Sequence, residues 1–406
     1  MTSKDESVYS ELGVRTIINA RGTNTVLGGS RFSEKVLAAM QEANTAHVDM
    51  EDLLVKSGEK IARLVGAEAA FPTSGAFAGL VVSAAGIMTG TDREKIMNLP
   101  RTKGMKNEFL LQKNMRYMFD RCIEVPGAKL KLIGDQHGAS SQTLSDSIGP
   151  KTAGLLYPVH LASNEGAIPL ASALSIAHEK GIAVLVDSAF QLYPLDHFRS
   201  LITSGADLLA FSSKYMGGPN SVGFICGKKE YVDAAASNSF LAYERPGTFS
   251  VGRGYKLDRH EITALIAVIE EWLDMDHDNR IKTMEMHLQV IAERVSDLPN
   301  VTIEEVAAAP GKPPWPQLLV HIDENKLGKT AQQIEQALID GEPSIWINGG
   351  GTATNLHKNS LIIRAIDFAE GDDQIVAERL RRCLLYTSDA ADERSSVDLG
   401  GRRIIK

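Results

Sequence analysis

Short apolar runs alternate with amphipathic stretches along most of the chain. This alternation is typical of β-α-β units, in which each buried strand is followed by a helix that covers a largely parallel sheet. The runs predict strands at Glu108–Gln112, Lys129–Ile133, Gly154–Tyr157, Ala183–Asp187, Asp207–Phe211 and Gly223–Cys226. The predicted fold class is therefore α/β, with a mostly parallel sheet in one large domain.

Two helices stand out between these strands. Pro169–Lys180 has Pro at its start and Gly181 after its end, which is the usual placing of these residues at helix boundaries. Ala76–Met88 is apolar on nearly all sides. A helix without a polar face is expected to be buried.

The pattern changes after Gly254. Apolar residues recur at helical spacing over Asp258–Leu298, which predicts a long helical stretch that connects two domains. The strand-like segments VTIEEV, LLVHID and LIIRAI follow, with two helices between or after them, and predict a smaller C-terminal α+β domain. The predicted organisation is an N-terminal arm at 1–45, a large domain at 46–257, the connecting stretch at 258–298 and the small domain at 299–382.

The last part of the chain, residues 383–406, differs abruptly from the amphipathic helix before it. Its sequence, CLLYTSDAADERSSVDLGGRRIIK, resembles the translation of a transposase-type sequencing-library adapter. No period of two or 3.6 residues runs through the segment. A natural polar tail is the alternative, but we treat the segment as an artefact and leave it out of the fold and the site.

Composition and charge exclude several classes of protein. With 43% hydrophobic and 23% charged residues in 406, the chain has the composition of an ordinary folded protein. No apolar run reaches the roughly 18 residues that cross a bilayer, so no membrane segment is expected. The net charge of -8 disfavours nucleic-acid binding. The three cysteines lie far apart, which predicts no metal site and a reduced, cytoplasmic location.

Three features suggest the chemistry. The first is the turn Thr73-Ser74-Gly75-Ala76, which leads directly into a helix. Unpaired amides at a helix N-terminus, together with hydroxyl groups, form a seat for a phosphate. Most such turns are only helix caps, and this one lacks the lysine of a nucleotide-binding loop.

The second and third features are charged residues that follow apolar strands. Asp187 ends a buried strand at its carboxyl end, the edge where α/β sheets bind ligands. Lys214 follows another strand and precedes a Gly-Gly-Pro turn. Burial there lowers the pKa of a lysine and makes its amine nucleophilic. Taken alone, Asp187 is equally compatible with a helix cap or with a metal or nucleotide contact, and Lys214 with a surface lysine.

Together the three features match the needs of pyridoxal phosphate. This cofactor requires a phosphate seat, a carboxylate that keeps its ring nitrogen protonated, and a lysine that holds its aldehyde as a Schiff base. The order of seat, Asp187 and Lys214 suits one long α/β domain. The constellation therefore predicts pyridoxal 5'-phosphate as the cofactor.

The chain also resembles the fold-type-I pyridoxal-phosphate enzymes, and among them the selenocysteine-synthase-like family. That family includes L-seryl-tRNA selenium transferases and D-glucosaminate-6-phosphate ammonia-lyases. The resemblance covers nearly the whole chain up to Arg382. The stretches that carry it are Ile18–Thr23, Leu27–Ser30, His47–Glu51, Gly66–Ala70, Gly104–Glu108, Ile148–Thr152, Asp187–Ala189 and Lys214 with its Gly-Gly-Pro.

The resemblance implies an aminotransferase-like fold and a set of site residues. Lys214 would be the Schiff-base lysine and Asp187 the partner of the ring nitrogen. The further cofactor-binding positions are Thr73, Ser74, Gly75, Ala76, Ala189, Gln191, Ser212 and Arg253. Gln191 is expected near the ring hydroxyl. Arg253 matches a basic loop that approaches the cofactor in relatives across a subunit interface; an exposed loop is the alternative.

The resemblance further implies a reaction. We expect a lyase that removes the Cα proton of an amino acid or amino sugar acid and eliminates a β substituent, working as a homodimer or larger homo-oligomer. The alternatives are a selenium transferase, an aminotransferase and a non-catalytic pyridoxal-phosphate-binding protein. The acidic chain makes tRNA an unexpected partner.

Two positions bear on the substrate. Ammonia-lyase relatives carry a histidine over the ring where this chain has Met115. His160 follows a predicted strand and is expected to have a packing or capping role.

Overall fold

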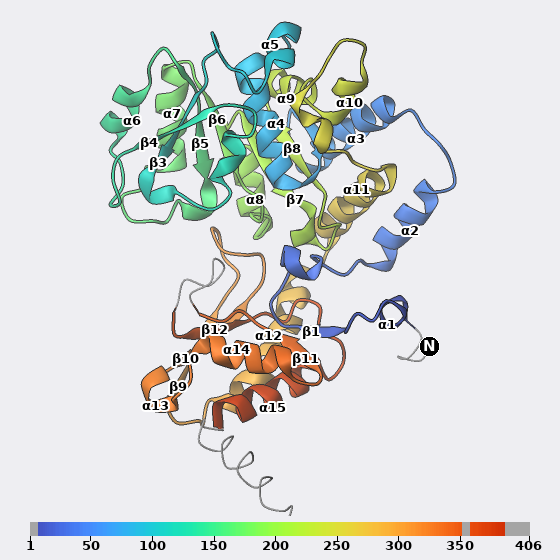
Figure 1. The fold of residues 1–406 in the computed structure, drawn as a ribbon, viewed down its shortest axis with the longest axis vertical. Helices are drawn as coiled ribbons and strands as arrows, with labels where there is room; N and C mark the ends of the chain where they lie inside the picture. Colours follow the sequence, from blue (N-terminus) through green and yellow to red (C-terminus); the bar gives the residue numbers. More distant parts are fainter. Residues whose placement is uncertain (1–6, 351–357, 386–406) are drawn as a thin grey trace, which may run out of the picture. The chain divides into compact units, whose positions relative to one another are not determined.

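The computed structural model describes residues 7–350 and 358–385, which form two compact units (Figure 1). The large unit comprises Gly28–Met275 and Ala309–Pro314. The small unit comprises the N-terminal residues up to Leu27, Asp276–Ala308 and the chain from Trp315 onward. The predicted arm at 1–45 is thus divided between the units after Leu27. Residues 386–406, most of the proposed artefact, lie outside the described residues.

The large unit is built on a seven-stranded sheet with the order β2-β8-β7-β6-β5-β3-β4. The five strands from β7 to β4 are parallel, and β8 is antiparallel to both of its neighbours. The bounds are β2 Ala69–Thr73, β3 Glu108–Gln112, β4 Lys129–Ile133, β5 Thr152–Pro158, β6 Ala183–Asp187, β7 Leu208–Ser212 and β8 Gly223–Gly227. The predicted α/β class with a mostly parallel sheet is confirmed.

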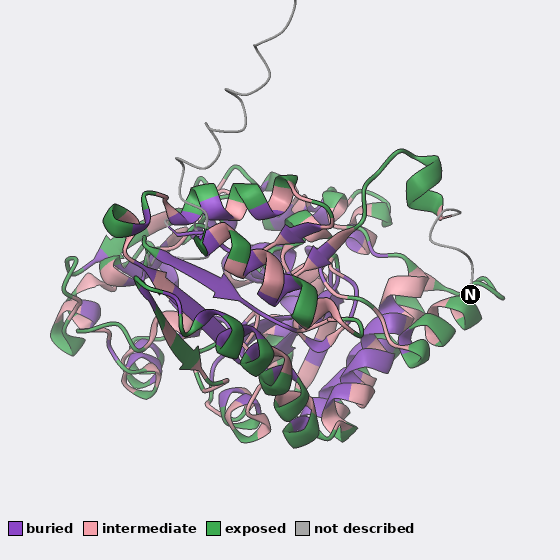
Figure 2. Cartoon of the chain, turned by 90° about the horizontal axis from the view of Figure 1, so that it is seen from below, coloured by how far each residue is buried: buried purple, intermediate pink, exposed green. Residues whose placement is uncertain are grey.

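Helices cover this sheet and enclose the main hydrophobic core. The longer ones are α2 Glu34–Ala43, α3 Met50–Val65, α4 Gly75–Thr89, α7 Leu170–Glu179, α8 Leu195–Ile202, α9 Lys229–Ala236 and α11 Arg259–Asp274; shorter ones are α5 Arg93–Asn98, α6 Ser141–Ser147 and α10 Phe240–Glu244. Buried residues gather on the strands and on the inner sides of the helices, and exposed residues on their outer sides (Figure 2).

Helix α4 is the buried apolar helix that the sequence predicts. It packs against β6, β7 and β8 and against α9. A methyl group on Gly86 would lie 2.6 Å from the backbone nitrogen of Ala235, so the absence of a side chain there allows α4 and α9 to approach closely. The core thus fixes the start of α4, at Gly75, against the sheet.

The small unit has its own core. Its elements are α1 Val8–Glu11, β1 Ile17–Asn19, α12 His277–Val295, β9 Val301–Val306, β10 Gln317–Ile322, α13 Glu324–Leu327, α14 Ala331–Asp340, β11 Ser344–Trp346, β12 Ser360–Ile363 and α15 Asp372–Leu385. An antiparallel sheet has the order β12-β10-β9, and β1 pairs with β11 in parallel. The three strand-like segments of the sequence correspond to β9, β10 and β12.

The predicted connecting stretch is two helices instead of one. Helix α11 ends at Asp274 and α12 begins at His277. The side chain of Asp276 accepts a hydrogen bond of 3.0 Å from the amide of Asn279 and so starts a new helix. The boundary between the two units falls at this point. No helix in the described ranges is long and apolar enough to cross a membrane.

Candidate active site

Three of the predicted site segments meet at the carboxyl ends of strands β2, β6 and β7. Gly223 of β8 is paired with Thr73 of β2 on one side and with Ser212 of β7 on the other. The amide of Ser212 donates a 3.0 Å hydrogen bond to the carbonyl of Ala189, just after β6. A row of backbone contacts therefore runs from the turn before α4, across β8 and β7, to the segment after Asp187.

Gly223 allows the turn and β7 to come this close. A methyl group at Gly223 would lie 2.2 Å from the carbonyl oxygen of Phe211 and 3.1 Å from the Cα of Gly75. No side chain can occupy that space without moving backbone. The start of α4 and the end of β7 are consequently held together by the sheet itself.

The turn before α4 presents unused hydrogen-bond donors. Ser74 precedes the helix, but its side chain makes no capping hydrogen bond. The hydroxyl of Thr73 donates to the carbonyl of Gly75 at 3.1 Å, and Gly75 has a φ of +77°, which favours glycine. The first amides of α4 and the hydroxyl of Ser74 can therefore serve an anion.

Asp187 lies at the carboxyl end of β6 and is 4% exposed. Its Oδ1 accepts a 3.1 Å hydrogen bond from the amide of Ala189, and its Oδ2 accepts a 2.5 Å hydrogen bond from the hydroxyl of Tyr117. Next to it, the hydroxyl of Ser188 is fully buried and has no partner among the described residues. An unsatisfied polar group beside a buried carboxylate suits a site that binds a polar ligand.

Lys214 lies in the 3-10 turn η5 (Ser213–Met216), directly after β7. Burial lowers the pKa of its amine below the usual value, because burial disfavours the charged form. Its Nζ lies 5.2 Å from the centre of the Tyr215 ring. The hydroxyl of Ser30 donates to the backbone carbonyl of Lys214, which ties the N-terminal segment of the large unit to this turn.

Aromatic rings connect the surroundings of Asp187 with those of Lys214. The ring centres of Tyr117 and His160 are 5.2 Å apart, those of His160 and Phe190 5.4 Å, and those of Phe190 and Tyr215 5.7 Å. Sequence analysis did not single out Tyr117, because nothing in its local pattern distinguishes it. His160 packs as expected, and burial lowers its pKa.

Two predicted residues have other contacts in this chain. The carboxamide oxygen of Gln191 accepts a 2.9 Å hydrogen bond from the amide of Gly311 and lies 3.1 Å from Nε2 of His197. Arg253, in η6 (Val251–Gly254), pairs with Glu244 at 3.0 Å and lies over the ring of Tyr243. Within the described residues, the guanidinium group of Arg253 therefore contacts Glu244 and Tyr243.

Met115, which stands where lyase relatives carry a histidine, is fully buried. Its sulfur accepts a hydrogen bond of 2.9 Å from the side chain of Gln112. It belongs to the core, and the aromatic side chain that contacts Asp187 from this loop is Tyr117.

The residues at this edge suit a small flat ring that carries an anion. The helix start and Ser74 can bind a phosphate, Asp187 can pair with a protonated ring nitrogen, and the amine of Lys214, whose pKa is lowered by burial, can attack an aldehyde. All of these groups belong to the large unit. The donor set therefore fits pyridoxal phosphate.

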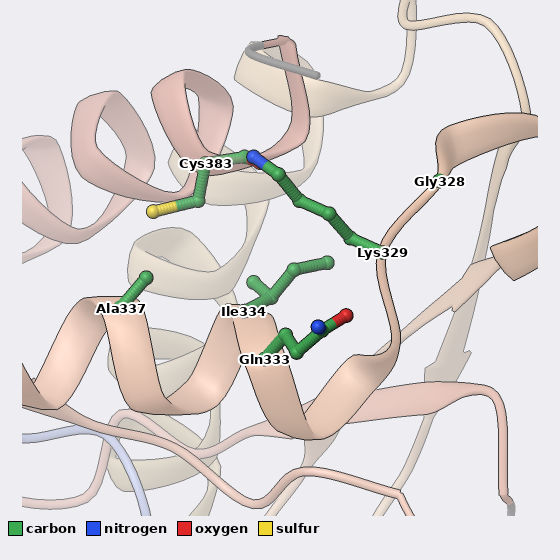
Figure 3. Close-up of a pocket in the computed structure, with 6 residues that line it drawn as sticks. All are labelled: Gly328, Lys329, Gln333, Ile334, Ala337 and Cys383. Atoms are coloured by element: carbon green, nitrogen blue, oxygen red, sulfur yellow. The ribbon is translucent and has the colours of Figure 1, made fainter. Parts of the chain in front are cut away.

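The small unit contains a separate cavity of about 140 Å³, shown in Figure 3. Its lining is Gly328, Lys329, Gln333, Ile334, Ala337 and Cys383. Cys383 is the first residue of the segment that we treat as an artefact, so we assign no function to this cavity. In the parts of the chain that the structure describes, no three His, Cys, Asp or Glu side chains are grouped so that they could hold a metal ion.

The chain is similar to known pyridoxal-phosphate enzymes. The aminotransferase class-V family model matches residues 123–242, a stretch that contains Asp187 and Lys214. The D-glucosaminate-6-phosphate ammonia lyase of Salmonella typhimurium is 27% identical over 389 residues, covering 94% of this chain and 99% of the relative. The 5'-C-glycyluridine monooxygenase-decarboxylase of a Streptomyces species is 26% identical, covering 93% and 92%.

An L-seryl-tRNA(Sec) selenium transferase of Desulfomicrobium baculatum is 24% identical and is matched over only 58% of its length, or 66% of this chain. A solved structure of a D-glucosaminate-6-phosphate ammonia-lyase superposes with a TM-score of 0.78 at 26% identity, covering 96% of this chain and all of the other. The chain is thus a pyridoxal-phosphate-dependent enzyme with the fold of fold type I, and it is similar to these ammonia-lyases and selenium transferases.

Proposed function

We propose that the protein is a lyase that acts on an amino acid or amino sugar acid. The observation that carries the proposal is the row of backbone contacts through Thr73, Gly223, Ser212 and Ala189, which brings the start of α4 close to the segments that contain Asp187 and Lys214. Similarity to an ammonia lyase over nearly the full length of both chains supports this reaction class over the selenium transferases, which are matched over a smaller part of their length.

When bound, pyridoxal phosphate would supply an electron sink for the Cα atom of the amino acid. Asp187 would pair with the protonated ring nitrogen. Lys214 would hold the cofactor through its Nζ, and the same Nζ would take the Cα proton of the substrate. Burial lowers the pKa of this amine and so favours the neutral form that a base requires.

Elimination at the neighbouring carbon completes the reaction. With a β-hydroxy amino acid, the Cα–H and Cβ–O bonds break, the hydroxyl group leaves as water, and hydrolysis of the resulting enamine consumes water and releases ammonia. The net products are a 2-keto acid and ammonia, so no oxidant or reductant is required.

We further propose roles for the remaining predicted residues. The phosphate seat consists of Ser74, Gly75, Ala76 and Ser212, supported by Thr73. Ala189 orients Asp187 through its amide. Gln191 would contact the ring hydroxyl group, and Arg253 would serve the site of a neighbouring subunit.

Ser74→Ala is expected to weaken pyridoxal-phosphate binding about tenfold, because one hydrogen bond to a charged phosphate is lost. The melting temperature of the cofactor-free protein should not change, since the Ser74 hydroxyl caps nothing. Fluorescence titration with the cofactor and thermal denaturation measure the two quantities.

Ser140→Ala is the matched control for Ser74→Ala. The hydroxyl of Ser140 accepts a 3.0 Å hydrogen bond from the amide of Thr143 and caps α6. This variant should lower stability by about 1 kcal/mol and leave cofactor affinity unchanged. Equal cofactor affinity in Ser74→Ala and wild type would remove Ser74 from the phosphate seat.

The substrate class is tested by a screen of D- and L-β-hydroxy amino acids, with amino sugar acids and their phosphates included. A lyase is expected to release ammonia and 2-keto acid in equal amounts, measured with glutamate dehydrogenase and lactate dehydrogenase assays. Transfer of the amino group to a keto acid without free ammonia would instead identify an aminotransferase. No turnover of any compound by cofactor-loaded protein would favour the non-catalytic alternative.

The selenium transferase alternative makes a different prediction. It requires binding of aminoacylated tRNA, which the net charge of -8 opposes. A gel shift with seryl-tRNA at physiological salt is expected to show no complex. A complex at micromolar protein would favour the transferase.

A second candidate function comes from the Streptomyces relative, whose name describes a monooxygenase-decarboxylase and whose similarity covers 93% of this chain. Oxygen uptake and carbon dioxide release, measured in the same substrate screen, separate this reaction from a lyase. Both relatives are named for substrates in which an amino acid is joined to a sugar framework, so the screen should include amino acids linked to nucleosides.

We also propose a homo-oligomer that works in the cytoplasm. The free cysteines Cys122 and Cys226 are buried, as suits a reduced compartment. Light scattering of the purified protein is expected to give a mass of at least two chains.

A further inference from the structure

Asp187 has a hydrogen-bond partner that the proposed mechanism does not yet use. The hydroxyl of Tyr117 donates to its Oδ2 at 2.5 Å. Tyr117 lies in the loop after β3, and β3 is separated from β6 by β5. The contact therefore joins two segments that are 70 residues apart in the chain.

The loop around Tyr117 is held by a second buried carboxylate. Asp120 is 1% exposed and accepts hydrogen bonds from Arg116, at 2.5 Å from Nε and 3.3 Å from Nη2. The same carboxylate lies 3.4 Å from the amide of Tyr117 and accepts a hydrogen bond from it. His160 packs edge-on against the Tyr117 ring at 5.2 Å. Tyr117 is thus held at its amide by Asp120 and at its ring by His160, which fixes the position of its hydroxyl group.

Among the titratable side chains around Asp187, Tyr117 is the one that donates a hydrogen bond to its carboxylate. Burial, and next the charge of Asp187, raise the pKa of Tyr117, so the hydroxyl keeps its proton. Burial lowers the pKa of His160 and raises the pKa of the Cys122 thiol, so both of these neighbours are neutral. The charge of Asp120 is balanced by Arg116.

A hydrogen bond from a neutral donor favours the ionised form of a carboxylate. Each carboxylate oxygen accepts about two hydrogen bonds, so Asp187 keeps capacity for a ring nitrogen after binding Tyr117 and Ala189. We infer that Tyr117 is a positioning residue that holds the carboxylate of Asp187 oriented toward the ring nitrogen of the bound cofactor. The inference rests on the role of Asp187 in the proposed function.

Tyr117→Phe removes only the hydroxyl group and tests the inference. Without this donor, the carboxylate of Asp187 is held less firmly against the ring nitrogen, and the protonated ring is less stabilised. A less positive ring favours the proton on Lys214 Nζ. The pH midpoint of the absorbance change of bound cofactor is expected to rise by about one unit, a tenfold change in proton affinity. The kcat should fall about tenfold with KM little changed.

Tyr157→Phe is the matched control. Tyr157 is fully buried in the large unit, whereas Tyr117 is partly buried, and the hydroxyl of Tyr157 donates to the backbone carbonyl of Ile168 at 3.0 Å. This variant loses a buried hydrogen bond without touching Asp187, so its pH midpoint should equal that of wild type. Thermal denaturation of both variants separates loss of fold from loss of positioning.

An unchanged midpoint in folded Tyr117→Phe, or an equal shift in Tyr157→Phe, overturns the inference. The spectra are recorded without substrate, so they decide the role of Tyr117 even where the lyase assay fails. Conversely, ammonia release by wild type together with an unchanged midpoint would leave the proposed reaction standing and remove Tyr117 from it.

Discussion

Protein carrying Lys214→Ala is expected to lose the absorbance near about 420 nm that marks pyridoxal phosphate attached to a lysine. Turnover should fall by a factor of about 10⁴, because both the attachment point and the proposed base are lost. Absorption spectra of cofactor-loaded protein and single-turnover assays measure the two effects.

The backbone of the Lys214 turn should survive this substitution. The hydroxyl of Ser30 donates to the backbone carbonyl of Lys214. The amide of Gly218 donates a 2.9 Å hydrogen bond to the backbone carbonyl of Ser213. Lys229→Ala provides the control, because Lys229 is an exposed lysine paired with Asp233 in α9. If Lys214→Ala keeps the absorbance band near about 420 nm, Lys214 is not the residue to which the cofactor is attached.

Asp187→Asn is expected to lower kcat about a thousandfold while leaving the fold intact. The asparagine keeps the shape of the side chain and can still accept from the amide of Ala189. It carries no negative charge, however, and cannot hold the ring nitrogen in its protonated state. Stopped-flow measurement of Cα-deuterium exchange reports this step directly.

Asp207→Asn is the control for a buried aspartate. Asp207 is 1% exposed and lies at the opposite end of β7, where it binds His178 at 2.9 Å and Lys228 at 2.5 Å. Its substitution should reduce stability but leave the spectrum of the bound cofactor unchanged. A loss of exchange of similar size in both variants would show that Asp187 acts only through the fold.

The parallel part of the sheet was predictable from the sequence. The strands β3, β4 and β6 have the predicted bounds, because β3 and β6 have apolar centres and β4 alternates lysine with leucine. Strand β2 was not predicted. Its sequence, AAFPT, contains Pro72, which cannot donate to a central strand, and it lies at the edge of the sheet where a proline is tolerated.

Helical periodicity did not reveal the break between α11 and α12. Apolar residues recur at helical spacing on both sides of the junction, and no Gly or Pro interrupts Asp258–Leu298, so the stretch resembles one helix. The signal that was available is Asp276, a residue type that commonly caps a new helix. Its position also marks the boundary between the two compact units.

The charged members of the site could be located by their positions after strands, whereas Tyr117 could not. Asp187 and Lys214 follow buried strands, and parallel strands bring their carboxyl ends to one edge. Tyr117 contacts Asp187 only because β5 sets the spacing between β3 and β6. No local pattern encodes such a contact across the sheet.

The row of backbone hydrogen bonds through Gly223 has a practical consequence for directed evolution. Each member of the row is constrained by its neighbours, and Gly223 tolerates no side chain at all. Random mutation there would mostly yield inactive clones. Libraries aimed at new specificities should instead diversify the loops at residues 113–119 and 159–167, while sparing Tyr117, because these loops reach the same edge without forming part of the sheet.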